Sequence, residues 1–172
     1  MAKGQIDRVT VGTVAAASDE IAPPGLAQSW DNVGLLVGSR KAACRRVLLC
    51  IDLTPAVLRE AAASRCEMVV SYHPPLFKPV KTILADSDGT EAIVHEAIRR
   101  GIAIYSPHTA LDAAEGGVND ILAGLCGLSD VGPFEYVPVG RRECKVVTFV
   151  PPAQLDKVAS AMFAAGAGRM FL

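Results

Sequence analysis

The sequence predicts an α/β protein in which a layered sheet of parallel strands is flanked by helices. Short apolar runs alternate along the chain with longer segments of helical periodicity. The runs are continuously apolar, which is typical of strands buried on both faces of a parallel sheet. Hydrophobic residues make up 51% of the 172 residues and charged residues 20%. This composition indicates a globular chain that holds one domain, or one domain and a fragment.

Four strands are expected where apolar residues follow one another over a few positions. They cover residues 45–52, 66–71, 101–106 and 145–151. Helical segments separate the strands, and a strand–helix–strand connection gives parallel neighbours in one sheet.

Five helices are expected from the spacing of apolar residues. They cover residues 7–21, 55–64, 89–100, 116–127 and 153–167. Thr54 and Thr90 are the expected N-caps of the second and third helices, and Gly127 is the expected stop of the fourth. The pair Pro23-Pro24 ends the first helix, because proline cannot continue it.

Polar side chains follow three of the predicted strands. Asp52, His73 and His108 come directly after strand-like runs, and Asp112 comes four residues after His108. Right-handed crossovers place the carboxyl ends of parallel strands at one edge of the sheet, where ligand sites of such folds lie. We therefore expect these side chains to belong to one site.

Histidine and aspartate together suit zinc, manganese or iron(II). A catalytic metal needs about three protein ligands and an open position, and it brings the pKa of a bound water to near 7. His73, His108 and Asp112 would supply three ligands. Other roles remain open: Asp52 and Asp112 could cap a turn or helix, and His108 could hydrogen-bond a loop carbonyl. His95 falls inside a predicted helix and is expected to be an ordinary helix position.

Two further features could hold an anion. Gly116 and Gly117 precede a predicted helix whose N-terminus could accept one, although a tight turn also needs glycine. Lys78 could hold a phosphate near His73, but a solvated lysine is the favoured interpretation. Neither a G-x-S-x-G nucleophile motif nor a phosphate-binding loop of the G-x-x-x-x-G-K-[ST] type occurs in the sequence.

Composition narrows the class of protein. The net charge of −1 and the pI of about 6.3 disfavour a general nucleic-acid binder. The five cysteines are odd in number and form no C-x-x-C motif, so neither a disulfide framework nor a zinc knuckle is indicated. Without a signal-peptide pattern or a run of about 18 apolar residues, we expect a cytoplasmic protein with no membrane partner.

Three segments resemble the hallmark segments of the Ngg-one-interacting-factor-three (Nif-three-like) family. They are SWDNVGLLVG at residues 29–38, SYHPPLFKPVK at 71–81 and SPHTALDAAEGGVND at 106–120. Bacterial members are commonly named dinuclear metal-centre hexameric proteins or GTP cyclohydrolase 1 type 2 homologues. The resemblance implies a Nif-three-like fold of parallel strands and helices, and a toroidal homohexamer.

The resemblance also implies roles for single residues. His73 and Asp112 would ligate metal, and His108 would lie beside the metal as a ligand or as the neighbour of one. A further segment, W-D-N, would line the site or form a structural turn. It consists of Trp30, Asp31 and Asn32.

The chain departs from the family pattern in two respects. Tyr72 stands where many members have a histidine, so one ligand is expected to be missing or replaced. Members also place a histidine and a glutamate near their C-terminus, and this chain ends before such a segment, so we expect an incomplete site. Residues 1–142 are expected to form the N-terminal half of a metal-site domain, and residues 143–172 the start of an inserted ferredoxin-like domain.

The leading hypothesis is a metal-dependent hydrolase-like protein. A divalent centre, expected to be dinuclear and to hold zinc, manganese or iron, would activate water against a nucleotide or another phosphorylated small molecule. The alternative is a non-catalytic regulatory protein that binds a protein partner and has a structural metal site. A third hypothesis is metal trafficking or sensing, in which no substrate exists.

Overall fold

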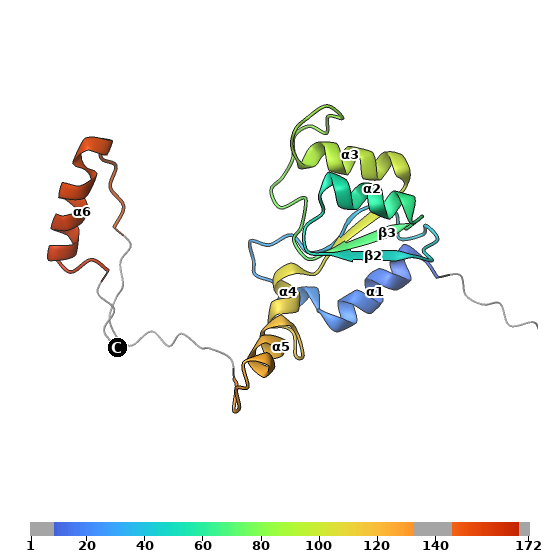
Figure 1. Ribbon diagram of the computed structural model, residues 1–172, viewed down its shortest axis with the longest axis horizontal. Helices are drawn as coiled ribbons and strands as arrows, with labels where there is room; N and C mark the ends of the chain where they lie inside the picture. The colour runs from blue at the N-terminus through green and yellow to red at the C-terminus, as the bar shows by residue number, and fades with distance from the viewer. Residues whose placement is uncertain (1–8, 133–145, 169–172) are drawn as a thin grey trace, which may run out of the picture. The chain divides into compact units, whose positions relative to one another are not determined.

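The computed structural model describes residues 9–132 and 146–168. The chain divides into two compact units, unit 1 at Met1–Gly132 and unit 2 at Pro133–Leu172 (Figure 1). Unit 1 holds a sheet covered by helices on both faces, which confirms the predicted α/β class.

The sheet of unit 1 has four strands in the order β1-β4-β3-β2. Their bounds are Gly34–Val37 for β1, Val47–Cys50 for β2, Met68–Ser71 for β3 and Ala103–Ser106 for β4. The strands β2, β3 and β4 are parallel, as predicted. The fourth, β1, is an antiparallel edge strand that the sequence analysis did not expect, and it pairs Gly34 with Ser106 of β4.

Five α-helices accompany this sheet. They are α1 at Val11–Ile21, α2 at Pro55–Ala63, α3 at Thr90–Arg100, α4 at His108–Ala113 and α5 at Val118–Leu125. A short 3-10 helix, η1 at Pro24–Leu26, follows α1 where the two prolines were expected to end it. Figure 1 shows α2 and α3 on one face of the sheet and α1 on the other. The short helix α4 was not predicted, because it covers only six residues.

Two apolar clusters hold the layers together. On one face, Leu58 of α2 and Val94 of α3 pack with Val69 and Ile104 of the central strands. On the other face, Val11 and Ala15 of α1 pack with residues of β3 and β4, of which Tyr105 is the largest. Both central strands are therefore buried from both sides, which explains their continuously apolar sequence.

Glycine is required at one close approach beside the sheet. Gly38, directly after β1, has a φ of +111°. A Cβ at this position would lie 2.7 Å from the Cβ of Ala103 at the start of β4. Glycine alone combines this backbone conformation with such close packing.

Capping residues and glycines next to the helices predicted most of the helix ends. The Thr54 hydroxyl accepts a hydrogen bond from the Val57 N–H at 3.2 Å, which confirms the predicted cap of α2. Gly127 follows α5 with a φ of +69°, which confirms the predicted stop. The prediction for Thr90 was wrong, because Gly89 occupies the N-cap of α3 and Thr90 is its first helical residue. The backbone of Gly89 already has the extended conformation that a cap requires.

Unit 2 contains a 3-10 helix, η2 at Pro152–Gln154, and the helix α6 at Leu155–Ala164. This confirms the helix predicted for residues 153–167. The strand predicted for residues 145–151 was wrong over its described part, because residues 146–150 form no strand. Phe149 in this run is 96% exposed, so apolar composition here reflects no burial within the described residues. The expected domain boundary at residues 142 and 143 lies outside the described residues.

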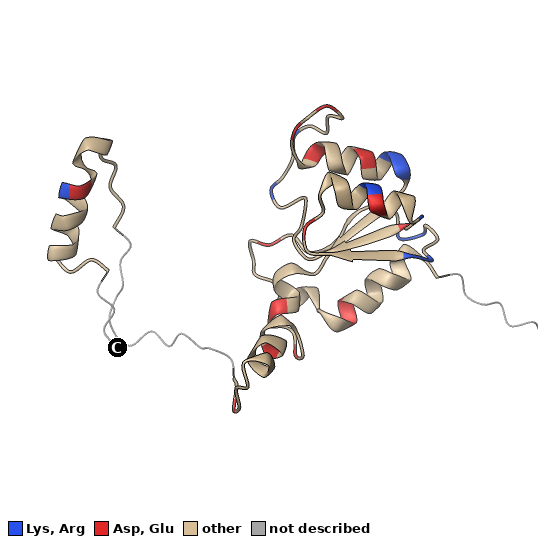
Figure 2. Cartoon of the chain, in the orientation of Figure 1, with Lys and Arg blue, Asp and Glu red and all other residues tan. Residues whose placement is uncertain are grey.

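Charged side chains of unit 1 are scattered over its helices and loops (Figure 2). Two arginine pairs lie where parallel strands begin: Arg45-Arg46 precedes β2, and Arg99-Arg100 ends α3 just before β4. They are therefore remote from the carboxyl ends of the strands. Among the described helices, none is long and apolar enough to span a membrane.

Candidate functional site

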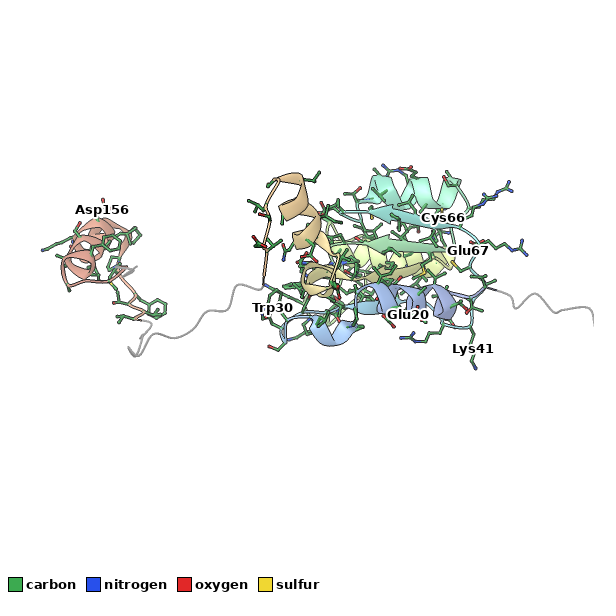
Figure 3. All side chains as sticks on the ribbon, turned by 90° about the horizontal axis from the view of Figure 1, so that it is seen from below. Glu20, Trp30, Lys41, Cys66, Glu67 and Asp156 are labelled. Carbon is green, nitrogen blue, oxygen red and sulfur yellow. The ribbon has the colours of Figure 1, made fainter. Side chains whose placement is uncertain are left out.

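The carboxyl ends of the three parallel strands carry the predicted site residues. Asp52 lies two residues after β2, Tyr72 and His73 follow β3, and His108 lies two residues after β4. Figure 3 shows Trp30, which belongs to the segment before β1, at the opposite end of the sheet from Cys66 and Glu67, which precede β3. The antiparallel direction of β1 explains this position, because its start adjoins the end of β4.

Two buried serines tie these strand ends together. The Ser71 hydroxyl lies 2.8 Å from the carbonyl oxygen of His73 and 3.3 Å from that of Ile51. The Ser106 hydroxyl donates a hydrogen bond of 2.8 Å to the carbonyl oxygen of Tyr72. Both serines are fully buried. They satisfy backbone groups that the sheet ladder no longer pairs, and so they fix the peptide that carries His73. Sequence reasoning missed them, because a serine that ends a strand is a common turn residue.

His108 is paired with a buried carboxylate. Its Nδ1 lies 2.9 Å from both carboxylate oxygens of Asp31, and the exposed fractions of the two side chains are 17% and 0%. Burial disfavours the charge of Asp31, but hydrogen bonds from Thr109, His108 and the backbone N–H of Asn32 outweigh this effect and hold the pKa of Asp31 below its usual value. This carboxylate therefore stays ionised beside the imidazole.

His73 has a carboxylate partner of its own. Its Nδ1 lies 2.7 Å from Oδ1 of Asp52. This pair is open to water, because the exposed fractions of the two side chains are 48% and 66%. The helix-capping role that remained open for Asp52 is taken by Thr54, whose side chain caps α2.

Both pairs use the same ring nitrogen. An ionised carboxylate accepts hydrogen bonds and cannot donate them, so Nδ1 carries the proton in each neutral imidazole. The Nε2 atoms of His73 and His108 then hold the free lone pairs. A carboxylate behind the distal nitrogen is also the usual environment of a metal-ligating histidine. The two rings lie close together, with a distance of 5.6 Å between their centroids.

Asp112 lies on α4, one turn after His108, rather than in a loop. Tyr72 donates a hydrogen bond of 2.5 Å to its Oδ1. Burial raises the pKa of Tyr72 to about 12, with further contributions from this hydrogen bond and from the charges of Asp112 and Asp31. The phenol therefore keeps its proton at neutral pH and keeps donating to Asp112.

The backbone of His108 is unusual for a non-glycine residue. Its φ is +31°, although it begins a right-handed helix. Such a conformation costs about 1–3 kcal/mol and persists where surrounding contacts impose it. Here backbone contacts on either side of His108 supply that constraint, because the Thr109 N–H donates a hydrogen bond of 3.2 Å to Asp31 and the Ala110 N–H donates one of 3.0 Å to the Pro107 carbonyl oxygen.

The predicted ligands are brought to one edge of the sheet but are not gathered into a ready ligand set. Within residues 9–132 and 146–168, no three histidine, cysteine, aspartate or glutamate side chains are arranged to hold a metal ion. One oxygen of Asp112 is engaged by Tyr72, as described above. The donor chemistry nevertheless fits a divalent cation, because two carboxylate-backed imidazoles and a carboxylate are available.

The remaining candidates lie elsewhere or have other roles. His95 lies within α3, as expected of an ordinary helix residue. The Gly116 N–H before α5 donates to the carboxylate of Asp120 at 2.7 Å, so a bound anion at this helix end would meet a negative charge. Lys78 is exposed in the loop after β3.

The sequence of the chain matches a known protein family. A family model described as Duf34/NIF3 (NGG1p interacting factor 3) matches residues 9–171. The chain belongs to the DUF34/NIF3 family. This confirms the resemblance drawn from the three sequence segments.

Relatives with curated names include an animal protein and bacterial proteins. NIF3-like protein 1 of Drosophila melanogaster is 40% identical over 126 residues, which cover 73% of this chain and 43% of that protein. The GTP cyclohydrolase 1 type 2 homolog of Halalkalibacterium halodurans is 35% identical over 160 residues, which cover 92% of this chain and 42% of that protein. The chain thus spans less than half the length of these relatives.

A solved structure shows the same architecture. The Bacillus cereus protein related to NIF3 is 30% identical, with a TM-score of 0.66 over 94% of this chain and 44% of that protein. The α/β fold is therefore that of NIF3-family proteins.

Proposed function

We propose that this chain is the part of a metal-dependent hydrolase that carries two imidazole ligands and one carboxylate ligand. The observation that carries the proposal is the pairing of His73 with Asp52 and of His108 with Asp31. These pairs leave two Nε2 atoms free at one edge of the sheet. The ligands would be His73, His108 and Asp112. The names of several relatives, which call them GTP cyclohydrolase 1 type 2 homologs, favour a nucleotide or another phosphorylated small molecule as substrate.

A divalent zinc, manganese or iron ion bound there would act as a Lewis acid that activates water. The residues themselves have distinct tasks. Asp31 and Asp52 fix the tautomers of the two imidazoles and increase their basicity. Tyr72 orients Asp112 through a hydrogen bond to one carboxylate oxygen, and the remaining lone pairs of that carboxylate are available to a cation. The exposed His73 pair provides a water-accessible side for a substrate.

Metal content provides the direct test. The purified chain, loaded with zinc, manganese or iron(II) and desalted, is measured by plasma mass spectrometry beside His73→Ala, His108→Ala and Asp112→Ala. We expect bound metal in the parent chain and its loss in all three variants. His95→Ala is the matched control, because the third histidine lies on α3, and it should bind as the parent does. Turnover of a phosphoester by the loaded parent, and its loss in the same variants, would support hydrolysis.

Two results would overturn the proposal. Metal retained by all three variants would place the cation elsewhere in the chain. Bound metal that is lost as expected, without turnover of any phosphoester or nucleotide in a chain extended to the length of the relatives, would favour the non-catalytic role instead. Binding of a protein partner by the His73→Ala variant would then be the positive evidence for that role.

A further inference from the structure

Two large aromatic side chains remain exposed beside the histidines. Trp30 is 59% exposed and Phe77 is 44% exposed. They come from segments far apart in the sequence, the first before β1 and the second in the loop after β3. Exposed aromatic rings are common singly, but two that meet at the edge of a polar site require an explanation.

The two rings contact one another and His108. Their centroids lie 5.9 Å apart with an interplanar angle of 69°, which is an edge-to-face arrangement. The centroid of the His108 ring lies 6.5 Å from that of Trp30 and 6.2 Å from that of Phe77. The aromatic pair therefore directly borders the imidazole that Asp31 orients.

The backbone under the pair is fixed. The Asn32 side-chain amide donates a hydrogen bond to the carbonyl oxygen of Leu76, which joins the residue two after Trp30 to the residue before Phe77. Asp31, between Trp30 and Asn32, accepts hydrogen bonds from His108 and Thr109. The rings are thus held together by polar contacts on the protein side, while their outer surfaces face water.

We infer that Trp30 and Phe77 form a stacking platform for a planar heteroaromatic ring of the substrate. This inference rests on the proposed function, because it assigns a substrate class to the same site. In an edge-to-face pair, one face of a ring is left for an incoming planar group, and base–aromatic stacking requires no particular hydrogen-bond pattern. A ring stacked there would place its substituents next to His108, the ring of which lies beside that of His73. The substrate class is therefore a nucleotide-like compound, rather than a sugar phosphate without an aromatic ring.

The chain has a built-in reporter for this contact, because Trp30 is its single tryptophan. Guanosine 5′-monophosphate is titrated into the 172-residue chain in the presence of EDTA, and tryptophan fluorescence is recorded. We expect saturable quenching. Ribose 5-phosphate, which carries the sugar and phosphate without the base, should produce no saturable change at the same concentrations.

Variants identify the rings that bind. Calorimetric titration with guanosine 5′-monophosphate should show at least about a fivefold weaker affinity for Trp30→Leu and for Phe77→Leu, since stacking on an aromatic side chain is worth about 5- to 150-fold in affinity. Trp30→Phe retains a ring and should recover most of the binding, which separates stacking from misfolding. Phe149→Leu is the matched control, because Phe149 is an exposed aromatic residue of unit 2, and its affinity should equal that of the parent.

Several outcomes would overturn the inference. Equal responses to guanosine 5′-monophosphate and ribose 5-phosphate would show that phosphate alone is recognised. The Trp30→Leu variant could instead keep its nucleotide affinity and change its oligomeric state, as measured by light scattering. That result would show that Trp30 and Phe77 form a subunit contact. The titration contains EDTA, so nucleotide binding can be observed even if the chain binds no metal. Conversely, metal-dependent phosphoester turnover that persists in Trp30→Leu would refute the stacking platform without refuting the metal site.

Discussion

At the residue scale, the two histidines of the site differ in the surroundings of their carboxylate partners. The side chain of Asp31 is fully buried beside His108, whereas the side chain of Asp52 is largely exposed beside His73. A buried pair is screened little by solvent, while an exposed pair contributes little to stability. We therefore regard the His108 pair as the rigid part of the site and the His73 pair as the adjustable part.

Replacing Tyr72 by histidine should strengthen metal binding. The substitution removes the phenol that engages Asp112 and adds an imidazole next to the same carboxylate. We expect an affinity for zinc or manganese at least about tenfold higher than that of the parent, since changes around a ligand typically alter affinity 10–100-fold. Competition with a chromophoric chelator measures this. Tyr72→Phe frees Asp112 without adding a ligand, and equal affinities in the two variants would refute an added imidazole ligand.

The positive φ of His108 makes a prediction about stability. Both His108→Ala and His108→Gly remove the imidazole, but only glycine adopts a φ of +31° without strain. We expect His108→Gly to be more stable than His108→Ala by about 1 kcal/mol. Urea denaturation followed by circular dichroism compares the two. If alanine is equally stable, the helix start has relaxed and the native backbone was not constrained by the fold.

The sequence predicted the three histidine and aspartate positions at the strand ends, because each follows an apolar run. It did not predict from the residues alone that Asp31 would reach His108. That contact depends on β1, a four-residue strand whose antiparallel pairing brings residues 77 positions apart together. The ladder of β1 is also irregular between Leu35 and Val37, so its pattern is weak. The resemblance implied that the W-D-N segment lines the site or forms a structural turn, and the structure shows that Asp31 of this segment contacts His108.

At the scale of elements, a buried tyrosine connects α1 to the sheet. Tyr105 of β4 is 1% exposed, and its hydroxyl donates a 2.7 Å hydrogen bond to Asp19 of α1. Tyr105→Phe keeps the ring and removes this bond. We expect a loss of about 1–2 kcal/mol in the free energy of unfolding at pH 8, because the Asp19 carboxylate loses its donor. An unchanged stability would mean that water replaces the tyrosine hydroxyl.

The same residue should give the protein an alkaline limit. Burial, with the hydrogen bond and charge of Asp19, raises the pKa of Tyr105 above its ordinary value. A raised pKa stabilises the fold fully below the unfolded-state pKa of about 10, and this contribution is lost as pH rises further. The difference in unfolding free energy between the parent and Tyr105→Phe should therefore be smaller at pH 11 than at pH 8. A constant difference would contradict the linkage. Tyr72, with a pKa of about 12, is present in both proteins and should lower the unfolding free energy of both at high pH.

Helices and strands differed in how well the sequence located them. The helix α2 was placed to within one residue, because its cap Thr54 is a local signal. The start of α1 was predicted four residues too early, at residue 7, because the capping role of Thr10 was not recognised. The expected strand at residues 145–151 had the same apolar character as true strands but forms none over residues 146–150. A strand needs a partner, and an apolar run by itself carries no information about one.

At the scale of the whole molecule, the sheet ends in β2, an edge strand with apolar side chains in water. Leu49 is 75% exposed and Ile51, directly after the strand, is 62% exposed. An apolar edge of this kind is a template for pairing with another chain, and a charge placed on it opposes such pairing. Leu49→Lys should therefore lower self-association of the chain and change the free energy of unfolding by no more than about 0.5 kcal/mol.

Light scattering after size exclusion, over a tenfold range of concentration, measures this effect. The control is Ala63→Lys, which places the same charge at a small exposed residue at the end of α2. Reduced association in Leu49→Lys alone would locate the contact at the β2 edge. Equal reduction in both variants would show that added charge, rather than the edge, is responsible. An unchanged discrete oligomer in both would place subunit contacts on other surfaces.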